Sequence, residues 1–311
     1  MQKLIKIGTR ASLLAMAQST NIKNLIEKQY PEVTVELVKI VTKGDKILDV
    51  PLAMVGGKGL FVKELEDAML QNEVDLAVHS MKDVPAELPE GLHLGIITKR
   101  EDPRDAFISN DYKTFADLPA GAKVGTSSLR RKAQLGLLRK DLAIEDLRGN
   151  LDTRLRKLDE KQYDAIILAA AGLNRLKLSH RATSYFAPVE MLPAVGQGAV
   201  GIELRKADEE LLQGLLFLQD DATSVAVTAE RGFLTRLEGG CQVPIGAFAE
   251  VSGSQFTLAG LVASVDGENM VKREVTGNSE DAESIGRALA EEILGLGGKE
   301  ILEEVYGSEI S

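Results

Sequence analysis

The chain has 311 residues, of which 44% are hydrophobic and 27% charged, and its formal net charge is −10. The length predicts two or three domains of a soluble globular protein, and no stretch approaches the ~20 apolar residues of a membrane-spanning helix. The negative charge argues against nucleic acid as a partner. The single cysteine and the short apolar run at the N-terminus indicate a cytoplasmic protein without an export signal. Three scattered histidines give no metal-binding pattern, so we expect no metal ion.

The first hundred residues alternate between strand and helix patterns. Strands are predicted at 3–7, 33–41, 75–79 and 92–98, and helices at 12–29 and 60–71. This order predicts a parallel sheet covered by helices. The segment 42–58 interrupts the pattern with several glycines and a proline, which predicts a mobile loop ahead of the second helix.

A second alternating set follows. Strands are predicted at 123–125, 143–147 and 165–168, and helices at 128–138 and 150–161. We expect a second doubly wound sheet. The stretch 188–198 is predicted to cross back, so that 199–204 returns as a strand to the first sheet.

The final third changes character. A helix at 222–237 precedes three alternating runs at 245–251, 256–265 and 270–275, which predict an antiparallel sheet, and a helix at 281–296 would cover it. The expected fold is therefore two hinged, doubly wound α/β domains and a smaller C-terminal α+β domain. The predicted boundaries are 1–98 plus 199–216 for domain 1, 99–198 for domain 2 and 217–311 for domain 3.

Basic clusters lie at three strand-to-helix junctions, where free helix N–H groups favour an anion. Residues 123–157 carry ten Lys/Arg against four Asp/Glu, a local positive excess in an acidic chain. The clusters are Gly8–Ser12, Thr126–Lys132 and Arg148–Arg154. The simpler interpretation is N-capping by Ser12, Ser128 and Asn150 with solvated arginines. Three clusters at the carboxyl ends of parallel strands favour a site for several anionic groups.

Asp83 follows the predicted strand 75–79 at the same kind of strand end. Its carboxylate fits two roles, an ordinary turn cap or a group that transfers a proton or stabilises a developing cation. The residues alone do not decide between them. Gly56-Gly57-Lys58-Gly59 lacks the spacing of a nucleotide phosphate loop, and a flexible lid with a lysine at its base is the better interpretation.

Cys241 lies in Leu237-Glu238-Gly239-Gly240-Cys241-Gln242-Val243-Pro244, between a helix and a proline. A lone cysteine forms no intramolecular disulfide, which leaves packing or sulfur chemistry. Free cysteine is usually buried and inert, so composition alone favours packing. The adjacent glycines permit a tight, open loop that presents the thiol.

These motifs together closely resemble the porphobilinogen deaminase (hydroxymethylbilane synthase) family of the bacterial type. The matching text runs from Ile7 into the third domain and comprises IGTRASLLA (7–15), GGKGLFVKELE (56–66), AVHSMKDVP (77–85), GTSSLRR (125–131), LRGNLDTR (147–154), PAVGQGA (193–199) and the Cys241 loop. One departure is Met54, where some members have lysine, which puts a loop cation at that position in doubt.

The resemblance implies a transferase of heme and porphyrin biosynthesis. Cys241 would carry a dipyrromethane cofactor through a thioether, as a primer to which four porphobilinogen units are added. Asp83 would assist ammonia loss and stabilise the resulting azafulvene cation, and water would release the linear tetrapyrrole. The growing oligopyrrole carries acetate and propionate groups, which arginine suits well. The implied cofactor contacts are Lys82, Asp83, Ser128, Arg130, Arg131 and Arg148. The implied substrate contacts are Arg10, Ser12, Lys58, Arg148, Arg154, Arg175 and Gln197.

A rival class shares the expected architecture. Solute-binding proteins and the ligand domains of some regulators also have two hinged α/β domains that bind anions at strand ends. The missing export signal and the lack of a helix-turn-helix pattern weigh against both, and neither gives the Cys241 loop a purpose. The acidic C-terminal segment, with nine acidic residues against two basic ones in 280–311, suggests solvated helices and a monomer.

Overall fold

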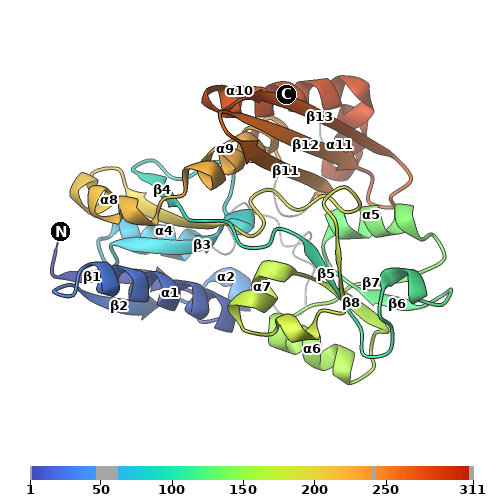
Figure 1. Cartoon of the computed structure of the whole chain (residues 1–311), viewed down its shortest axis with the longest axis horizontal. Coiled ribbons are helices and arrows are strands. Elements are labelled where there is room, and N and C mark those ends of the chain that lie inside the picture. Colours follow the sequence, from blue (N-terminus) through green and yellow to red (C-terminus); the bar gives the residue numbers. More distant parts are fainter. Residues whose placement is uncertain (1, 47–61, 240–242, 308–311) are drawn as a thin grey trace. The chain divides into compact units, whose positions relative to one another are not determined.

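The computed structural model describes residues 2–46, 62–239 and 243–307 (Figure 1). The chain divides into two compact units, which we call unit 1 and unit 2. Unit 1 comprises Met1–Glu101 with Ala199–Ser224, and unit 2 comprises Asp102–Gly198 with Val225–Ser311. No helix of the described residues is long and apolar enough to cross a membrane.

Unit 1 is built on a five-stranded sheet of order β2-β1-β3-β10-β4. Its strands are β1 (Leu4–Thr9), β2 (Thr34–Lys39), β3 (Leu76–Ser80), β4 (Leu92–Ile97) and β10 (Val200–Arg205). The strands β2, β1 and β3 are parallel, whereas β10 runs antiparallel to both β3 and β4. The predicted return of 199–204 to the first sheet is therefore confirmed.

Helices cover both faces of this sheet. They are α1 (Leu13–Gln29), α2 (Lys43–Lys46), α4 (Lys63–Leu70) and α8 (Glu209–Leu215). Successive residues of β3 point to opposite faces of the sheet. Leu76 and Val78 pack with α1 and α8 on one face, and Ala77 packs with α4 on the other. The strand is thus buried on both faces, which explains its apolar sequence.

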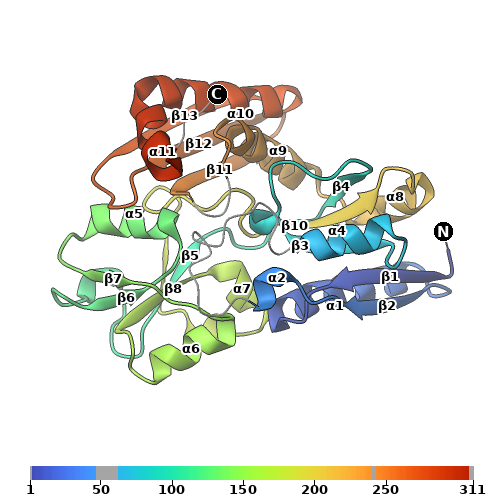
Figure 2. The same ribbon diagram turned by 180° about the vertical axis from the view of Figure 1, so that it is seen from behind.

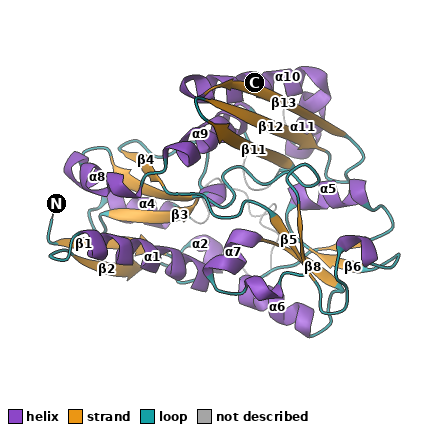
Figure 3. Ribbon diagram, in the orientation of Figure 1, coloured by secondary structure: helices purple, strands orange, loops and turns teal. Residues whose placement is uncertain are grey.

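Unit 2 contains a second five-stranded sheet of order β7-β6-β8-β5-β9. Its strands are β5 (Asp105–Ile108), β6 (Lys123–Gly125), β7 (Ala143–Glu145), β8 (Ala165–Ala169) and β9 (Ser184–Phe186). Again three strands are parallel, and β5 runs antiparallel to β8 and β9. On one face α5 (Leu129–Leu138) packs, and on the other α6 (Leu151–Asp159) and α7 (Ala170–Arg175). Figure 3 shows these helices against the orange strands.

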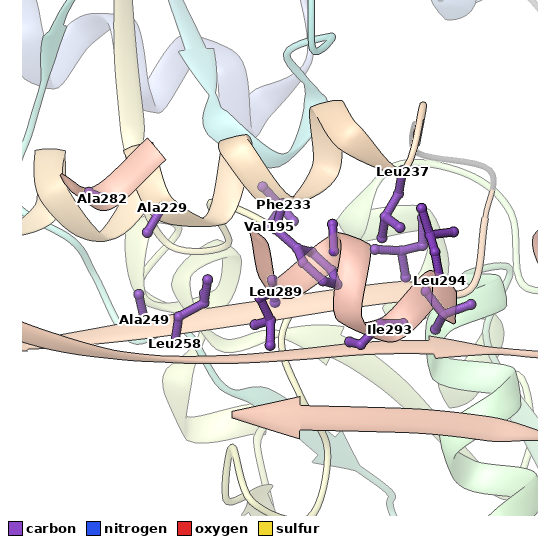
Figure 4. Packing of buried hydrophobic residues seen from close by; sticks show 14 of the residues in the cluster. Val195, Ala229, Phe233, Leu237, Ala249, Leu258, Ala282, Leu289, Ile293 and Leu294 are labelled. Atoms are coloured by element: carbon purple, nitrogen blue, oxygen red, sulfur yellow. The ribbon is translucent and has the colours of Figure 1, made fainter. Parts of the chain in front are cut away.

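The three-stranded antiparallel sheet of unit 2 has the order β11-β12-β13. The strands are β11 (Ile245–Ser252), β12 (Gln255–Ala263) and β13 (Met270–Asn278), and the helices are α9 (Asp221–Arg236), α10 (Ala282–Ile293) and α11 (Lys299–Tyr306). Residues of α9, α10 and α11 form one apolar core against this sheet. Figure 4 shows Phe233 of α9, Leu289 of α10 and Leu258 of β12 within this core.

The opposite face of this sheet packs on α5, as both Figure 1 and Figure 2 show. Leu261 and Ala263 of β12 form a separate core with Ala133 of α5 and with Leu192. The turn after β12 approaches α5 so closely that a Cβ on Gly267, whose φ is +76°, would lie against the Ala133 carbonyl. A side chain there would push the turn away from α5.

Shorter helical turns complete the chain. They are 3₁₀ turns at Met81–Asp83, Phe115–Asp117, Ser179–Arg181, Leu216–Leu218 and Ser279–Asp281, and a π-type turn at Leu294–Gly298. The last of these bends the chain between α10 and α11, because Leu296 and Gly297 leave helical φ/ψ.

The predicted fold class is confirmed, with two α/β sheets and a C-terminal three-stranded antiparallel sheet. The sequence prediction omitted β5, β9, α7, α8 and α11. Of the predicted loop 42–58, residues 43–46 form α2, and the rest lies outside the described residues. The predicted three-domain boundaries stay a prediction.

Candidate active site

In unit 1, four predicted site residues follow two neighbouring parallel strands. Arg10 and Ser12 follow β1, and Lys82 and Asp83 follow β3. Because the carboxyl ends of adjacent parallel strands meet at one edge of a sheet, these residues share that edge. Ser12 also caps α1, since its hydroxyl accepts a hydrogen bond from the Ala15 N–H at 3.3 Å.

The turn that carries Asp83 is fixed from several sides. The Met81 N–H donates to the Ala199 carbonyl at 3.1 Å, and Gln18 of α1 donates to the Ser80 hydroxyl at 2.9 Å. Met81 is buried. Asp83 itself is half-buried, and within residues 2–46, 62–239 and 243–307 no group donates a hydrogen bond to its carboxylate. In that part of the chain the carboxylate is therefore not used as a turn cap.

Three buried ionisable side chains lie close to β3, the strand that leads to Asp83. They are Glu66 of α4, His79 of β3 and Glu203 of β10, and we call them the Glu66 cluster. They are 5%, 5% and 0% exposed, and His79 Nε2 lies 2.8 Å from Glu203 Oε2. Burial, together with the charge of Glu203, raises the pKa of Glu66 to about 7. Sequence reasoning missed this cluster, because its members are far apart along the chain.

In unit 2, the basic clusters also share one sheet edge. Ser128, Arg130 and Arg131 follow β6, whereas Arg148 and Arg154 follow β7, and these strands are parallel neighbours. Ser128 caps α5, with its hydroxyl accepting from the Arg131 N–H at 3.4 Å. Asn150 occupies the N-cap position of α6 but makes no capping hydrogen bond. The capping interpretation thus holds for two of its three residues.

Arg130 and Arg131 are not solvated. They are 3% and 5% exposed, and both donate to Asp105, which is fully buried at the start of β5. Arg131 approaches one carboxylate oxygen through Nε at 2.9 Å and Nη2 at 2.6 Å, and Arg130 Nη1 reaches the other oxygen at 2.8 Å. Gln197 also donates to Asp105, at 3.0 Å. We call these four residues the Asp105 cluster.

The pKa values follow from this arrangement. Burial alone would raise the pKa of Asp105, but the charges and hydrogen bonds of Arg130 and Arg131 outweigh it, and the pKa is held far below its usual range. Burial lowers the pKa of Arg130, and although Asp105 opposes this shift, the neighbouring Arg131 adds to it. Two guanidinium groups therefore share a single carboxylate.

The remaining predicted residues of unit 2 are held by backbone carbonyls. Arg175 Nη2 donates to the Gly198 carbonyl at 2.6 Å, and Arg154 Nε donates to the Gly149 carbonyl at 2.8 Å. Gln197 donates to the Pro103 carbonyl at 2.6 Å. Each of these bonds helps to fix the direction of its donor side chain.

The structure thus gathers the predicted site residues into two sets, one in each unit. Unit 1 holds Arg10, Ser12, Lys82 and Asp83, and unit 2 holds Ser128, Arg130, Arg131, Arg148, Arg154, Arg175 and Gln197. Cys241, Lys58 and Met54 lie outside the described residues. Asp105 was missed, because a single acidic residue at the start of an apolar strand has no distinctive sequence signal. The described residues contain no cluster of His, Cys, Asp and Glu that would hold a metal ion.

Comparison with known families covers nearly the whole chain. Residues 5–213 match the model described as "Porphobilinogen deaminase, dipyromethane cofactor binding domain", and residues 224–295 match "Porphobilinogen deaminase, C-terminal domain". The chain belongs to the porphobilinogen deaminase family. The matched range 5–213 takes in the Asp83 edge and the Asp105 cluster.

Curated relatives agree. The chain is 58% identical over 308 residues to a porphobilinogen deaminase of Geobacter sulfurreducens, covering 99% of this chain and 96% of that protein. It is also 58% identical over 302 residues to a porphobilinogen deaminase of Maridesulfovibrio salexigens, covering 97% and 98% of the two chains. The chain is a transferase that builds hydroxymethylbilane from porphobilinogen and uses a dipyrromethane cofactor. The solute-receptor alternative is not favoured.

Solved structures of solute receptors also align. A methionine-bound nutrient-binding protein of Burkholderia cenocepacia has a TM-score of 0.43 at 14% identity, covering 68% of this chain and 90% of that chain. The aliphatic sulphonate-binding protein SsuA of Escherichia coli has a TM-score of 0.42 at 17% identity, covering 76% and 70%.

The residues of unit 2 fit the acidic side chains of a dipyrromethane. The Asp105 cluster carries a net positive charge of one, because two guanidinium groups pair with a single carboxylate. In addition, Arg130 Nε is buried without a hydrogen-bond acceptor among the described residues. A buried donor without a partner needs an acceptor. A carboxylate is the acceptor that guanidinium groups bind best.

Proposed function

We propose that this chain performs its family's reaction with Asp83 as the catalytic carboxylate and Cys241 as the attachment point of the dipyrromethane. The position of Asp83 carries the first part of this proposal. Its carboxylate lies at the carboxyl edge of β3, half-buried, beside Lys82, on a turn held by Met81 and Gln18. A fixed carboxylate in partly dry surroundings stabilises positive charge more strongly than one in water.

The chemistry asked of Asp83 follows from the substrate. Porphobilinogen loses ammonia from its aminomethyl group, and positive charge spreads into the pyrrole ring as that C–N bond breaks. Asp83 accepts a hydrogen bond from the pyrrole N–H and stabilises this charge until the new carbon–carbon bond forms. The dipyrromethane, when bound, supplies a primer with a free ring carbon for bond formation.

The cationic residues bind the acids of the ligands. We assign cofactor binding to Lys82, Ser128, Arg130, Arg131 and Arg148, and substrate binding to Arg10, Ser12, Arg148, Arg154, Arg175 and Gln197, with Lys58 also assigned to substrate. The support is the positive excess at the edge formed by β6 and β7, where the N-termini of α5 and α6 also favour anions. Arginine presents paired N–H groups that match a carboxylate.

The role of Asp83 is tested with Asp83→Asn, which keeps the size of the side chain and removes its charge. We expect kcat to fall by about 100-fold to 1,000-fold, with a smaller change in KM. The readouts are porphobilinogen consumption and ammonia release. Asp67→Asn is the matched control, because Asp67 is exposed on α4 of the same unit. Equal activity of both variants would refute a catalytic Asp83.

We also infer that the protein is a cytoplasmic monomer with the three domains 1–98 plus 199–216, 99–198 and 217–311. The single cysteine supports a reducing compartment. Acidic side chains exposed on α10 and α11 support solvated helices rather than a subunit interface. Light scattering coupled to size-exclusion chromatography tests the oligomeric state, and a mass of twice 33.6 kDa would contradict a monomer.

A further inference from the structure

We propose that Asp105 is a positioning residue that holds the ligand-binding side chains of unit 2 in one arrangement and sets their net charge. The family resemblance and the sequence motifs assign no role to Asp105. The inference rests on the proposed binding roles of Arg130, Arg131 and Gln197, and it adds the group that organises them.

The geometry supports orientation. Arg131 donates to Asp105 through two of its nitrogens, at 2.9 and 2.6 Å, which fixes the plane of its guanidinium. Its third nitrogen donates to the Ile167 carbonyl at 3.0 Å. Arg130 donates through Nη1 to Asp105 at 2.8 Å and to the Leu192 carbonyl at 2.6 Å. Because all three guanidinium nitrogens of Arg131 donate hydrogen bonds, both the plane and the direction of the guanidinium group are fixed.

The position of Asp105 makes it a rigid anchor. It is the first residue of β5, paired with Ala169 of β8 and Phe186 of β9, and it is 0% exposed. Arg130 and Arg131 come from α5, and Gln197 comes from the segment that leads to β10. One carboxylate therefore joins two segments that are far apart in sequence.

Charge supports the second half of the proposal. A buried charge is costly unless it is paired. Without Asp105 the two guanidinium groups would carry two uncompensated charges, and with it they carry one. A single carboxylate of a ligand balances that remaining charge, and the buried Arg130 Nε, which has no acceptor within residues 2–46, 62–239 and 243–307, is a donor that such a carboxylate can satisfy. Asp105 thus makes the site suitable for one acid group rather than two.

Chemical rescue separates positioning from a merely structural role. In Asp105→Ala the carboxylate is lost and a space of similar size remains, which added formate can enter. We expect kcat/KM for porphobilinogen to fall by about 100-fold, and formate to restore about tenfold while chloride at equal ionic strength restores none. Asp102→Asn is the control, because Asp102 forms an ion pair with the half-buried Arg104 and is not a member of the Asp105 cluster. It should show neither the loss nor the rescue.

A second readout does not depend on activity. In a Cys241→Ser background, which would lack the cofactor, formate should raise the melting temperature of Asp105→Ala above its value in chloride, and should not do so for Asp102→Asn. If the wild type failed to consume porphobilinogen, the proposed function would fail, and this melting comparison would still test Asp105. Identical effects of the two salts on both readouts would overturn the proposal.

A measurement on the unaltered cluster covers the case in which Asp105→Ala does not fold. With ¹⁵N-labelled arginine, the Nε–H signal of Arg131 should have the same chemical shift and slow exchange in the wild type and in Cys241→Ser. The Nε–H signal of Arg130 should differ between them, because its missing acceptor would come from the ligand. Movement of the Arg131 signal on cofactor loss would contradict a fixed anchor.

Discussion

The two units bury their charges in opposite ways. In unit 2, the carboxylate of Asp105 receives hydrogen bonds from Arg130, Arg131 and Gln197, and its pKa is held far below the usual range. In unit 1, burial and the charge of Glu203 raise the pKa of Glu66 to about 7. The Asp105 cluster therefore has a fixed charge at every physiological pH, whereas the Glu66 cluster gains or loses a proton near neutrality.

This difference matches the proposed roles of the two edges. An edge that binds carboxylates needs permanent positive charge, and arginine with an internal counter-charge supplies it. Unit 1, which carries the proposed catalytic carboxylate, instead buries a carboxyl group, Glu66, that takes up a proton near neutrality. Similar sheets, each with four strands that run in one direction and one strand antiparallel to them, thus support different electrostatics.

The largest expected effect on stability is at the Asp105 cluster. Arg131→Ala removes two of the donors to the buried Asp105, and breaking a buried ion pair costs about 3 to 5 kcal/mol. We expect a loss of this size in the free energy of unfolding by urea. The control is Arg156→Ala, whose side chain is 64% exposed in its pair with Glu160 and should cost under about 1 kcal/mol. Equal losses in the two variants would show that the Asp105 cluster contributes no special stability.

The Glu66 cluster predicts that the stability of the folded protein depends on pH, because the pKa of Glu66 is raised whereas that of Asp105 is lowered. The pKa of Glu66 is raised in the folded state from its ordinary value of 4.5 to about 7, so between these pH values the folded protein keeps a proton that the unfolded chain loses. Its contribution to stability is full below pH 4.5 and is lost as the pH rises to about 7. Glu66→Gln mimics the protonated form, so at pH 8 it should be more stable than the wild type by about 1 to 3 kcal/mol.

Urea unfolding of Glu66→Gln and the wild type at several pH values between 4.5 and 8 measures this difference. Asp67→Asn is the control, because Asp67 lies next in the chain but is exposed. A stability difference between Glu66→Gln and the wild type that stays constant over the whole range would contradict the assigned pKa.

The smallest expected effect compares two helix starts at the edge of unit 2. Ser128 accepts a hydrogen bond from the Arg131 N–H, whereas Asn150 makes no capping hydrogen bond on α6. Ser128→Ala should therefore cost about 1 kcal/mol of unfolding free energy, and Asn150→Ala much less. Thermal melts of the two variants decide this, and the reverse order would rule out the capping difference.

Much of the fold follows from local patterns in the sequence. Strand β6 was predicted with its observed bounds, and α1, α5 and α9 to within a residue or so, because their apolar periodicity is strong and their ends carry capping or breaking residues. Helix α7 and strand β9 were missed, since six- and three-residue elements are too short for periodicity to show. Strand β5 was missed because a four-residue buried run has no alternation.

The site was predictable to the extent that it lies in local motifs. Residues after β1, β3, β6 and β7 were found because strand-to-helix junctions have a recognisable sequence. Asp105, Glu66 and Glu203 were not, because each meets its partners only through tertiary contacts between distant segments. The burial of Arg130 and Arg131 was also unforeseen, since a pair of arginines at a helix start is usually solvated.

The attachment of the primer at Cys241 is tested most directly by the intact mass of the denatured protein, purified from a host that makes porphobilinogen. Wild type and Cys241→Ser are measured side by side. The wild type should be heavier than its sequence by two linked pyrrole units, and Cys241→Ser should have the mass of its sequence alone. A wild type at its bare sequence mass would contradict a covalent primer on Cys241.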